Sequence, residues 1–214
     1  LSRGLGDVYK RQLRRMRELF LRWNPSTTMK CAIFEENGNR HDMQRVLGHV
    51  TLQNAVRRMG DFVLTSCAAN ALQPYRQNDN GWDQGQVFFT PSQVWGMPPY
   101  YAQQMAAAHH RPLTVGCGVE GADGVLDVTA TRSREAGSVV LHIANTGAEP
   151  LRVGLRVDGM GKVSQARMVS LSGDLDAVNT PEEPRRIAPV GRELPAWAAQ
   201  TVDIAPYSYT TVSY

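Results

Sequence analysis

A glutamate at the end of a short apolar run is the first residue that could do chemistry. Glu35 follows Lys30–Phe34, a run long enough for a buried strand of a parallel sheet. In a (β/α)8 barrel the carboxyl ends of the strands face the active site. A carboxylate there is costly to bury unless it is paired or takes part in catalysis. We therefore predict a catalytic role for Glu35, against the alternative of an ordinary carboxylate at a strand end. Glu36 should point the other way.

A polar stretch with one indole is the second candidate, at residues 78–84. Sugars present hydroxyl groups and an apolar C–H face, so amides, carboxylates and aromatic rings bind them. Asn80 and Trp82 are the predicted sugar-binding residues of this stretch. The alternative is a simple turn, because Asn80-Gly81 is a common turn dipeptide. Tyr100 and Tyr101 could line a cleft, although aromatic residues at such a junction more often belong to a core.

Histidines and cysteines give no sign of a metal site. His109 and His110 are adjacent, but no carboxylate or thiol lies near them in sequence to complete a ligand set. The three cysteines, Cys31, Cys67 and Cys117, form no CxxC pair and no metal-ligand spacing. We expect buried apolar thiols and no bound metal.

The elements that must position these residues change character near residue 112. Before it, apolar spacing predicts helices over 13–23 and 42–60, strands over 30–34 and 62–65, and a helix over 99–110. Alternating strands and helices are typical of an α/β fold. Gly60 is expected to cap the second helix.

After residue 112 the pattern is all-β. Short segments rich in Val, Ile, Thr and Tyr are separated by Gly and Asp turns, at 125–131, 138–144, 151–157, 163–171 and 201–214. Such spacing predicts an antiparallel sandwich.

Charge is concentrated at one end of the chain. Residues 1–22 hold seven basic and two acidic residues, whereas the whole chain has a net charge of +3. A nucleic-acid binder spreads its basic residues over a folded face, so we predict no nucleic-acid partner. No apolar run is long enough for a transmembrane helix, and we predict no membrane partner. Residues 1–12 include Asp7–Gln12, which resemble a translated transposase-end sequencing adaptor, so we treat 1–12 as a non-native tail.

The ordered motifs resemble family 51 glycoside hydrolases, the α-L-arabinofuranosidases. Lys30–Glu35 is similar to the family strand that ends in the nucleophile, although typical members continue with Trp or Tyr where Glu36 stands. Residues 60–66 and 87–101 resemble the next barrel strand and the stretch before the last barrel helix. The most specific match is Leu171–Pro184, fourteen ordered positions of the family's C-terminal sandwich.

The resemblance implies both a fold and a reaction. The fold would be the C-terminal portion of a (β/α)8 barrel over 13–111, followed by an antiparallel, jelly-roll-like sandwich over 112–214. The reaction would be double displacement with retention, releasing terminal α-L-arabinofuranosyl units from arabinan- or arabinoxylan-type saccharides. Glu35 would be the nucleophile, and Asn70 would stand near the position of a sugar-binding amide. No metal and no organic cofactor are implied, and family members are often homo-oligomers.

The second catalytic carboxylate is not found in the sequence. Family members carry the acid/base in an Asn-Glu pair upstream of the nucleophile, and this chain has no such dipeptide. We therefore expect the 214 residues alone to be inactive. Two other readings stay open: another retaining barrel glycosidase, and a non-catalytic carbohydrate-binding sandwich.

Overall fold

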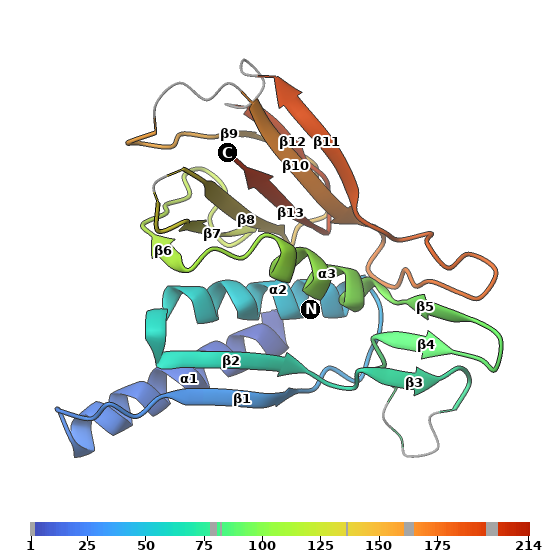
Figure 1. Ribbon diagram of the computed structural model, residues 1–214, viewed down its shortest axis with the longest axis horizontal. Coiled ribbons are helices and arrows are strands. Elements are labelled where there is room, and N and C mark those ends of the chain that lie inside the picture. The colour runs from blue at the N-terminus through green and yellow to red at the C-terminus, as the bar shows by residue number, and fades with distance from the viewer. Residues whose placement is uncertain (1–2, 78–80, 82, 136, 161–164, 196–200) are drawn as a thin grey trace.

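Three long helices accompany the strands of the chain, as a computed structural model shows (Figure 1). The structure describes residues 3–77, 81, 83–135, 137–160, 165–195 and 201–214, without the side chains of 3–10 and 165. The helices are α1 (Arg3–Trp23), α2 (Met43–Arg58) and α3 (Pro98–Ala108). Helix α2 begins where the Asp42 side chain accepts the backbone N–H of Arg45. It ends before Gly60, whose positive φ of 63° a side chain would disfavour, so the predicted cap position is confirmed.

A parallel pair of strands forms the layer farthest from the sandwich. Strand β1 (Cys31–Glu36) pairs with β2 (Val63–Ala68), and α2 connects them. Cys31 and Ile33 of β1 pack against helical residues such as Leu13 and Leu52, whereas Phe34 is 80% exposed on the opposite face. One face of this pair is therefore covered by helices and the other is open.

A small three-stranded sheet follows, which the sequence analysis did not predict. It contains β3 (Leu72–Pro74), β4 (Val87–Phe89) and β5 (Val94–Gly96) in the order β3-β4-β5. Each strand has only three residues, too few for a periodic pattern to stand out. Phe88 and Trp95 bury one face of the sheet.

The rest of the chain forms an antiparallel sandwich, as predicted from the sequence. Its main sheet has the order β11-β10-β13-β8-β7-β6, and a second sheet pairs β12 with β9. The strands are β6 (Leu113–Val115), β7 (Leu126–Arg132), β8 (Val139–Asn145), β9 (Leu151–Gly154), β10 (Gln165–Ser172), β11 (Val190–Pro195), β12 (Thr201–Ile204) and β13 (Ser208–Ser213). The segment expected as one strand over 201–214 is two strands in different sheets, because the chain turns at residues 205–207.

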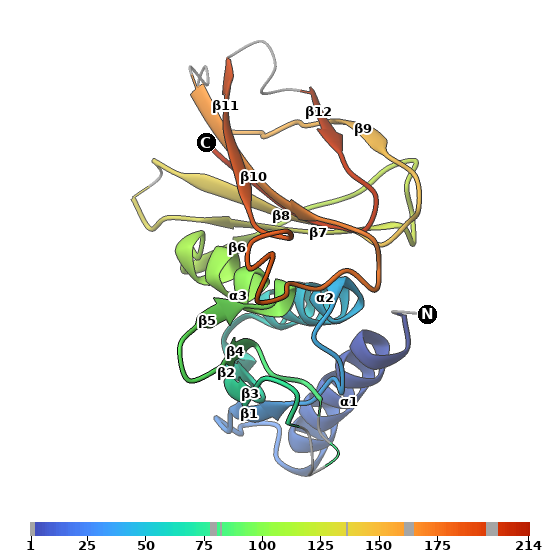
Figure 2. The same ribbon diagram turned by 90° about the vertical axis from the view of Figure 1, so that its right-hand side faces the viewer.

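Helices α2 and α3 lie between the parallel pair and the six-stranded sheet, as Figure 2 shows from the side. Residues of β8 alternate between two cores: Ile143 faces the β9–β12 pair, and Ala144 joins the core formed with the two helices. Both faces of the main sheet are thus buried, and the helices that frame the parallel pair rest on it. The strand ends that carry Glu35 are held in place by the sandwich through α2.

Candidate active site

The two parallel strands bring Glu35 and Asn70 to the same edge. Parallel strands run in one direction, so their carboxyl ends meet there. The backbone N–H of Ala69 donates to the Glu36 carbonyl over 3.1 Å, which joins the end of β1 to the chain just after β2. Glu35 is exposed at this edge, and Asn70 is half-buried.

A register irregularity between Ile33 and Glu36 decides which glutamate faces outward. Strict alternation would turn Glu35 toward the helices, on the side of Ile33. The irregularity instead leaves both Phe34 and Glu35 exposed and buries Glu36, which is only 1% exposed. The two glutamates therefore point to opposite sides, and the one that the sequence analysis singled out is the accessible one.

Glu36 is held by a chain of buried side chains. Its carboxylate lies 2.7 Å from His49 Nδ1, and Arg45 Nε donates to His49 Nε2 over 2.7 Å. Because the guanidinium can only donate, Nε2 must accept, and the remaining ring proton on Nδ1 goes to Glu36. Burial lowers the pKa of His49 despite the opposing hydrogen bond to Glu36, which agrees with a neutral ring. Burial also lowers the pKa of Arg45 to about 10, so it stays charged at neutral pH.

Arg45 also fixes the backbone of the edge. Its guanidinium donates to the Arg40 carbonyl over 2.8 Å and also reaches the carbonyls of Ala69 and Gln84. These carbonyls belong to three separate segments. Arg40 lies between β1 and α2, Ala69 follows β2, and Gln84 precedes β4. One buried cation thereby ties the three segments together.

Gln84 organises the amide side chains of the site. Its Oε1 accepts the backbone N–H groups of Gly38 and Asn39, each over 3.0 Å. Its Nε2 donates to Asn37 Oδ1 over 2.7 Å and to Asn70 Oδ1 over 3.4 Å. Gln84 thus engages the side-chain oxygens of both asparagines.

The predicted sugar-binding residues are only partly tested. Asn80 and Trp82 lie outside the described residues. Tyr100 and Tyr101 start α3 and line a different pocket, so they are not brought to Glu35. Arg45, His49 and Gln84 were not predicted as site residues from the sequence. Only the position of Gln84 inside the polar stretch signalled it, since an arginine and a histidine on a helix are ordinary surface residues in most sequences.

The Leu171–Pro184 loop connects the sandwich to the layer of the site. Asn179, buried within it, donates to the carbonyls of Gly96 and Ile187 over 2.8 and 2.9 Å. Gln93 donates to the Pro181 carbonyl over 2.7 Å. The loop thus reaches β5 and holds the three-stranded sheet against the sandwich.

Among the residues that the structure describes, no group of three or more His, Cys, Asp or Glu side chains could hold a metal ion. None of the helices in that part of the chain is long and apolar enough to cross a membrane.

Known structures share this fold. An arabinose-bound family 51 α-L-arabinofuranosidase superposes with a TM-score of 0.70 at 21% identity, over 82% of this chain and 28% of that chain. The enzyme from Thermotoga petrophila RKU-1 gives 0.73 at 18% identity, over 86% and 43%. The arabinose complex from Thermotoga maritima gives 0.73 at 18% identity, over 98% and 49%. The chain thus spans less than half the length of these enzymes.

Sequence comparison gives the family. No curated protein sequence matches this chain. The profile of the α-L-arabinofuranosidase C-terminal domain, however, matches residues 24–208, which is most of the chain. The chain therefore belongs to the family of α-L-arabinofuranosidase C-terminal domains.

Proposed function

We propose that this chain supplies the nucleophile half of a retaining α-L-arabinofuranosidase. The observation that carries the proposal is the opposite placement of the two glutamates. Glu35 is accessible at the carboxyl edge of the two parallel strands, while the buried Glu36 carboxylate is bound by His49, to which Arg45 donates. A nucleophile must reach the anomeric carbon, and a carboxylate fully engaged in a buried pair cannot.

The reaction follows from a pair of carboxyl groups roughly 5–5.5 Å apart. Glu35 attacks the anomeric carbon of a terminal arabinofuranosyl unit, and the glycosidic C–O bond breaks as a general acid protonates the leaving oxygen. Water, deprotonated by the same second group, then displaces Glu35. That second carboxyl group comes from a barrel strand that these 214 residues do not contain. The natural substrate would be an arabinose-bearing oligo- or polysaccharide.

The parallel pair also fits the proposed barrel. A parallel β1–β2 pair with α2 as its connection is the repeating unit of a (β/α)8 barrel, and α1 packs beside α2 as the preceding helix would. We propose residues 13–111 as the last two strand–helix units and 112–214 as the sandwich. The open face of β1 and β2 is then the barrel interior.

The test uses a longer protein that carries this chain after the preceding barrel strands. Glu35→Ala should reduce cleavage of an aryl α-L-arabinofuranoside by at least ~10³-fold, since removing a nucleophile leaves only residual catalysis. Azide, a small external nucleophile, should restore turnover in this variant and give an arabinofuranosyl azide of inverted configuration. Glu36→Ala is the matched comparison and should show no azide rescue. Azide rescue of Glu36→Ala but not of Glu35→Ala would instead identify Glu36 as the nucleophile.

The 214 residues by themselves should release no arabinose, because the general acid is absent. Purified chain is incubated with an aryl arabinofuranoside, and the released phenol is followed by absorbance. Release that disappears in Glu35→Ala would contradict the missing-acid part of the proposal while leaving the nucleophile assignment intact.

A further inference from the structure

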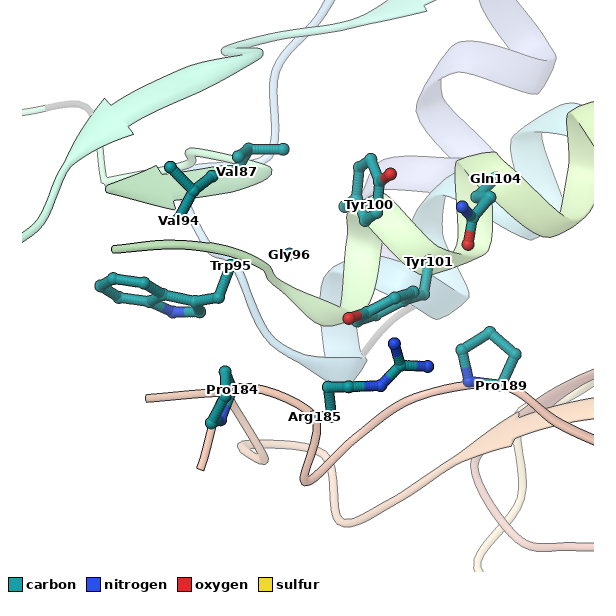
Figure 3. A pocket seen from close by; sticks show the side chains of 10 residues that line it. All are labelled: Val87, Val94, Trp95, Gly96, Tyr100, Tyr101, Gln104, Pro184, Arg185 and Pro189. Atoms are coloured by element: carbon teal, nitrogen blue, oxygen red, sulfur yellow. The ribbon is translucent and has the colours of Figure 1, made fainter. Parts of the chain in front are cut away.

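A second pocket lies away from Glu35, between α3 and the loop that follows Leu171–Pro184. It has a volume of about 570 Å³ and is formed by β4, β5, the first turns of α3 and residues 184–189. This volume is in the range of pockets that hold small ligands. Figure 3 shows Tyr100, Tyr101 and Gln104 of α3 on one side and Pro184, Arg185 and Pro189 of the loop on the other.

The polar groups of this pocket are mainly donors. Arg185 is exposed and makes no hydrogen bond or ion pair with any residue that the structure describes. The side chains of Gln104 and Tyr101 likewise have no hydrogen-bond partner among the described residues. No aspartate or glutamate lines the pocket; Glu182 and Glu183 precede it in the loop but are not part of its wall.

One further feature favours an anion. Among the residues that line the pocket, Arg185 alone carries a charge. A guanidinium at the wall of a pocket, without a partner in the described part of the chain, favours an anionic ligand.

The walls add an apolar component. Val87, Val94, Pro184 and Pro189 surround the donors, and the rings of Tyr100 and Tyr101 stand edge to face with centroids 5.2 Å apart. Aromatic faces stack on the C–H surfaces of sugar rings. A ligand that satisfies both components has a pyranose ring, which stacks on the aromatic faces, and a carboxylate, which matches the guanidinium fork in geometry.

We propose that this pocket binds a uronic-acid unit, with Arg185 as the carboxylate ligand. The choice of a sugar rests on the proposed glycosidase function, whereas the preference for a carboxylate rests on the pocket alone. Such a site would let the protein hold an acidic, uronate-substituted polysaccharide.

The experiment measures binding to the 214-residue chain by NMR chemical-shift titration, so it needs no catalysis. Methyl α-D-glucuronide is compared with methyl α-D-glucopyranoside, in which a neutral hydroxymethyl group replaces the carboxylate, and with sodium acetate, which lacks the sugar. We expect the glucuronide to bind at least about fivefold more tightly than either, with shifts at the Trp95 indole and the Gln104 amide. Equal binding of glucuronide and glucoside, or of glucuronide and acetate, would overturn the proposal.

Variants locate the site. Arg185→Gln should reduce glucuronide binding to the level of the glucoside. Arg186→Gln removes the same charge from the neighbouring exposed residue, which does not line the pocket, and should leave binding unchanged. An equal loss in both variants would indicate only general electrostatic attraction and contradict the site. Glu35→Gln should bind the glucuronide as the parent chain does, so the failure of the nucleophile assignment and the failure of this site are separate outcomes.

Discussion

The two sheets that flank α2 bury their surfaces very differently. The six-stranded sheet is covered on both faces, by the helices and by the β9–β12 pair. The parallel β1–β2 pair is covered only on its helix side, and Phe34 and Leu64 are 80% and 68% exposed on the other. One sheet is therefore a complete scaffold, and the other is a surface that presents Glu35. The difference teaches that the stability and the chemistry of this chain reside in separate layers joined by one helix.

Helix α2, which joins the two layers, makes polar contacts on both of its sides. Toward β1 it contributes the Arg45–His49–Glu36 arrangement. Toward the main sheet, Asn54 donates to the Asp127 carbonyl over 3.0 Å, and Arg58 pairs with the Asp127 carboxylate over 2.9 Å. Buried polar contacts of this kind require their partners in fixed positions, because an unmatched buried polar group is costly. The contacts on both sides therefore fix the orientation and position of α2.

The largest contrast is expected from removing apolar groups on the two sides. Leu171 is fully buried in the core between the helices and the main sheet. Leu171→Ala should lower the free energy of unfolding by roughly 3–4 kcal/mol, through lost burial and the cavity left behind. Phe34→Ala, on the open face, should change it by less than about 0.5 kcal/mol. Urea unfolding of the purified chain measures both, and similar losses would show that the open face is covered in solution.

The second effect concerns the buried guanidinium. Arg45→Met should cost about 3 kcal/mol, because His49 Nε2 and three backbone carbonyls lose their donor inside the protein. Arg58→Met removes a partly exposed ion pair from the other side of α2 and should cost less than about 1 kcal/mol. Thermal and urea unfolding compare the two variants. An equally small loss for Arg45 would mean that it does not tie the three segments together.

The smallest effect is a pH dependence of the main sheet. His142 is fully buried, its Nδ1 lies 2.8 Å from the Tyr209 hydroxyl, and burial lowers its pKa from 6.5 to about 2. Below pH 6.5 His142 is therefore protonated in the unfolded chain, whereas it stays neutral in the folded chain. Stability should fall with decreasing pH, by about 2 kcal/mol between pH 6.5 and 5.

The burial of His49, whose pKa is also lowered, adds a contribution of the same sign. His142→Gln should weaken the slope of unfolding free energy against pH, and His49→Gln tests the share of the other layer. A slope unchanged by His142→Gln would place the pH dependence elsewhere. A loss of slope in both variants would show that the two layers share the pH dependence of stability.

Much of the architecture is readable from the sequence. Apolar spacing at 42–60 predicted α2 within a residue or two, and alternating β-branched segments after 112 predicted the antiparallel sandwich. These elements are long enough for a period to show. The three-residue strands β3–β5 and the division of 201–214 between two sheets were missed, because such short segments are defined by their partners rather than by their own pattern.

At the site, the sequence by itself determined that a glutamate ends an apolar strand and that amides follow the next one. It did not determine that Glu35 faces outward, since strict alternation from Ile33 gives the opposite answer. That was decided by the irregularity in β1, together with a histidine on α2 that pairs with Glu36 and an arginine on α2 that donates to this histidine. The physical reason is that burying one carboxylate requires compensating partners, and only the packing of α2 against β1 shows which glutamate has them.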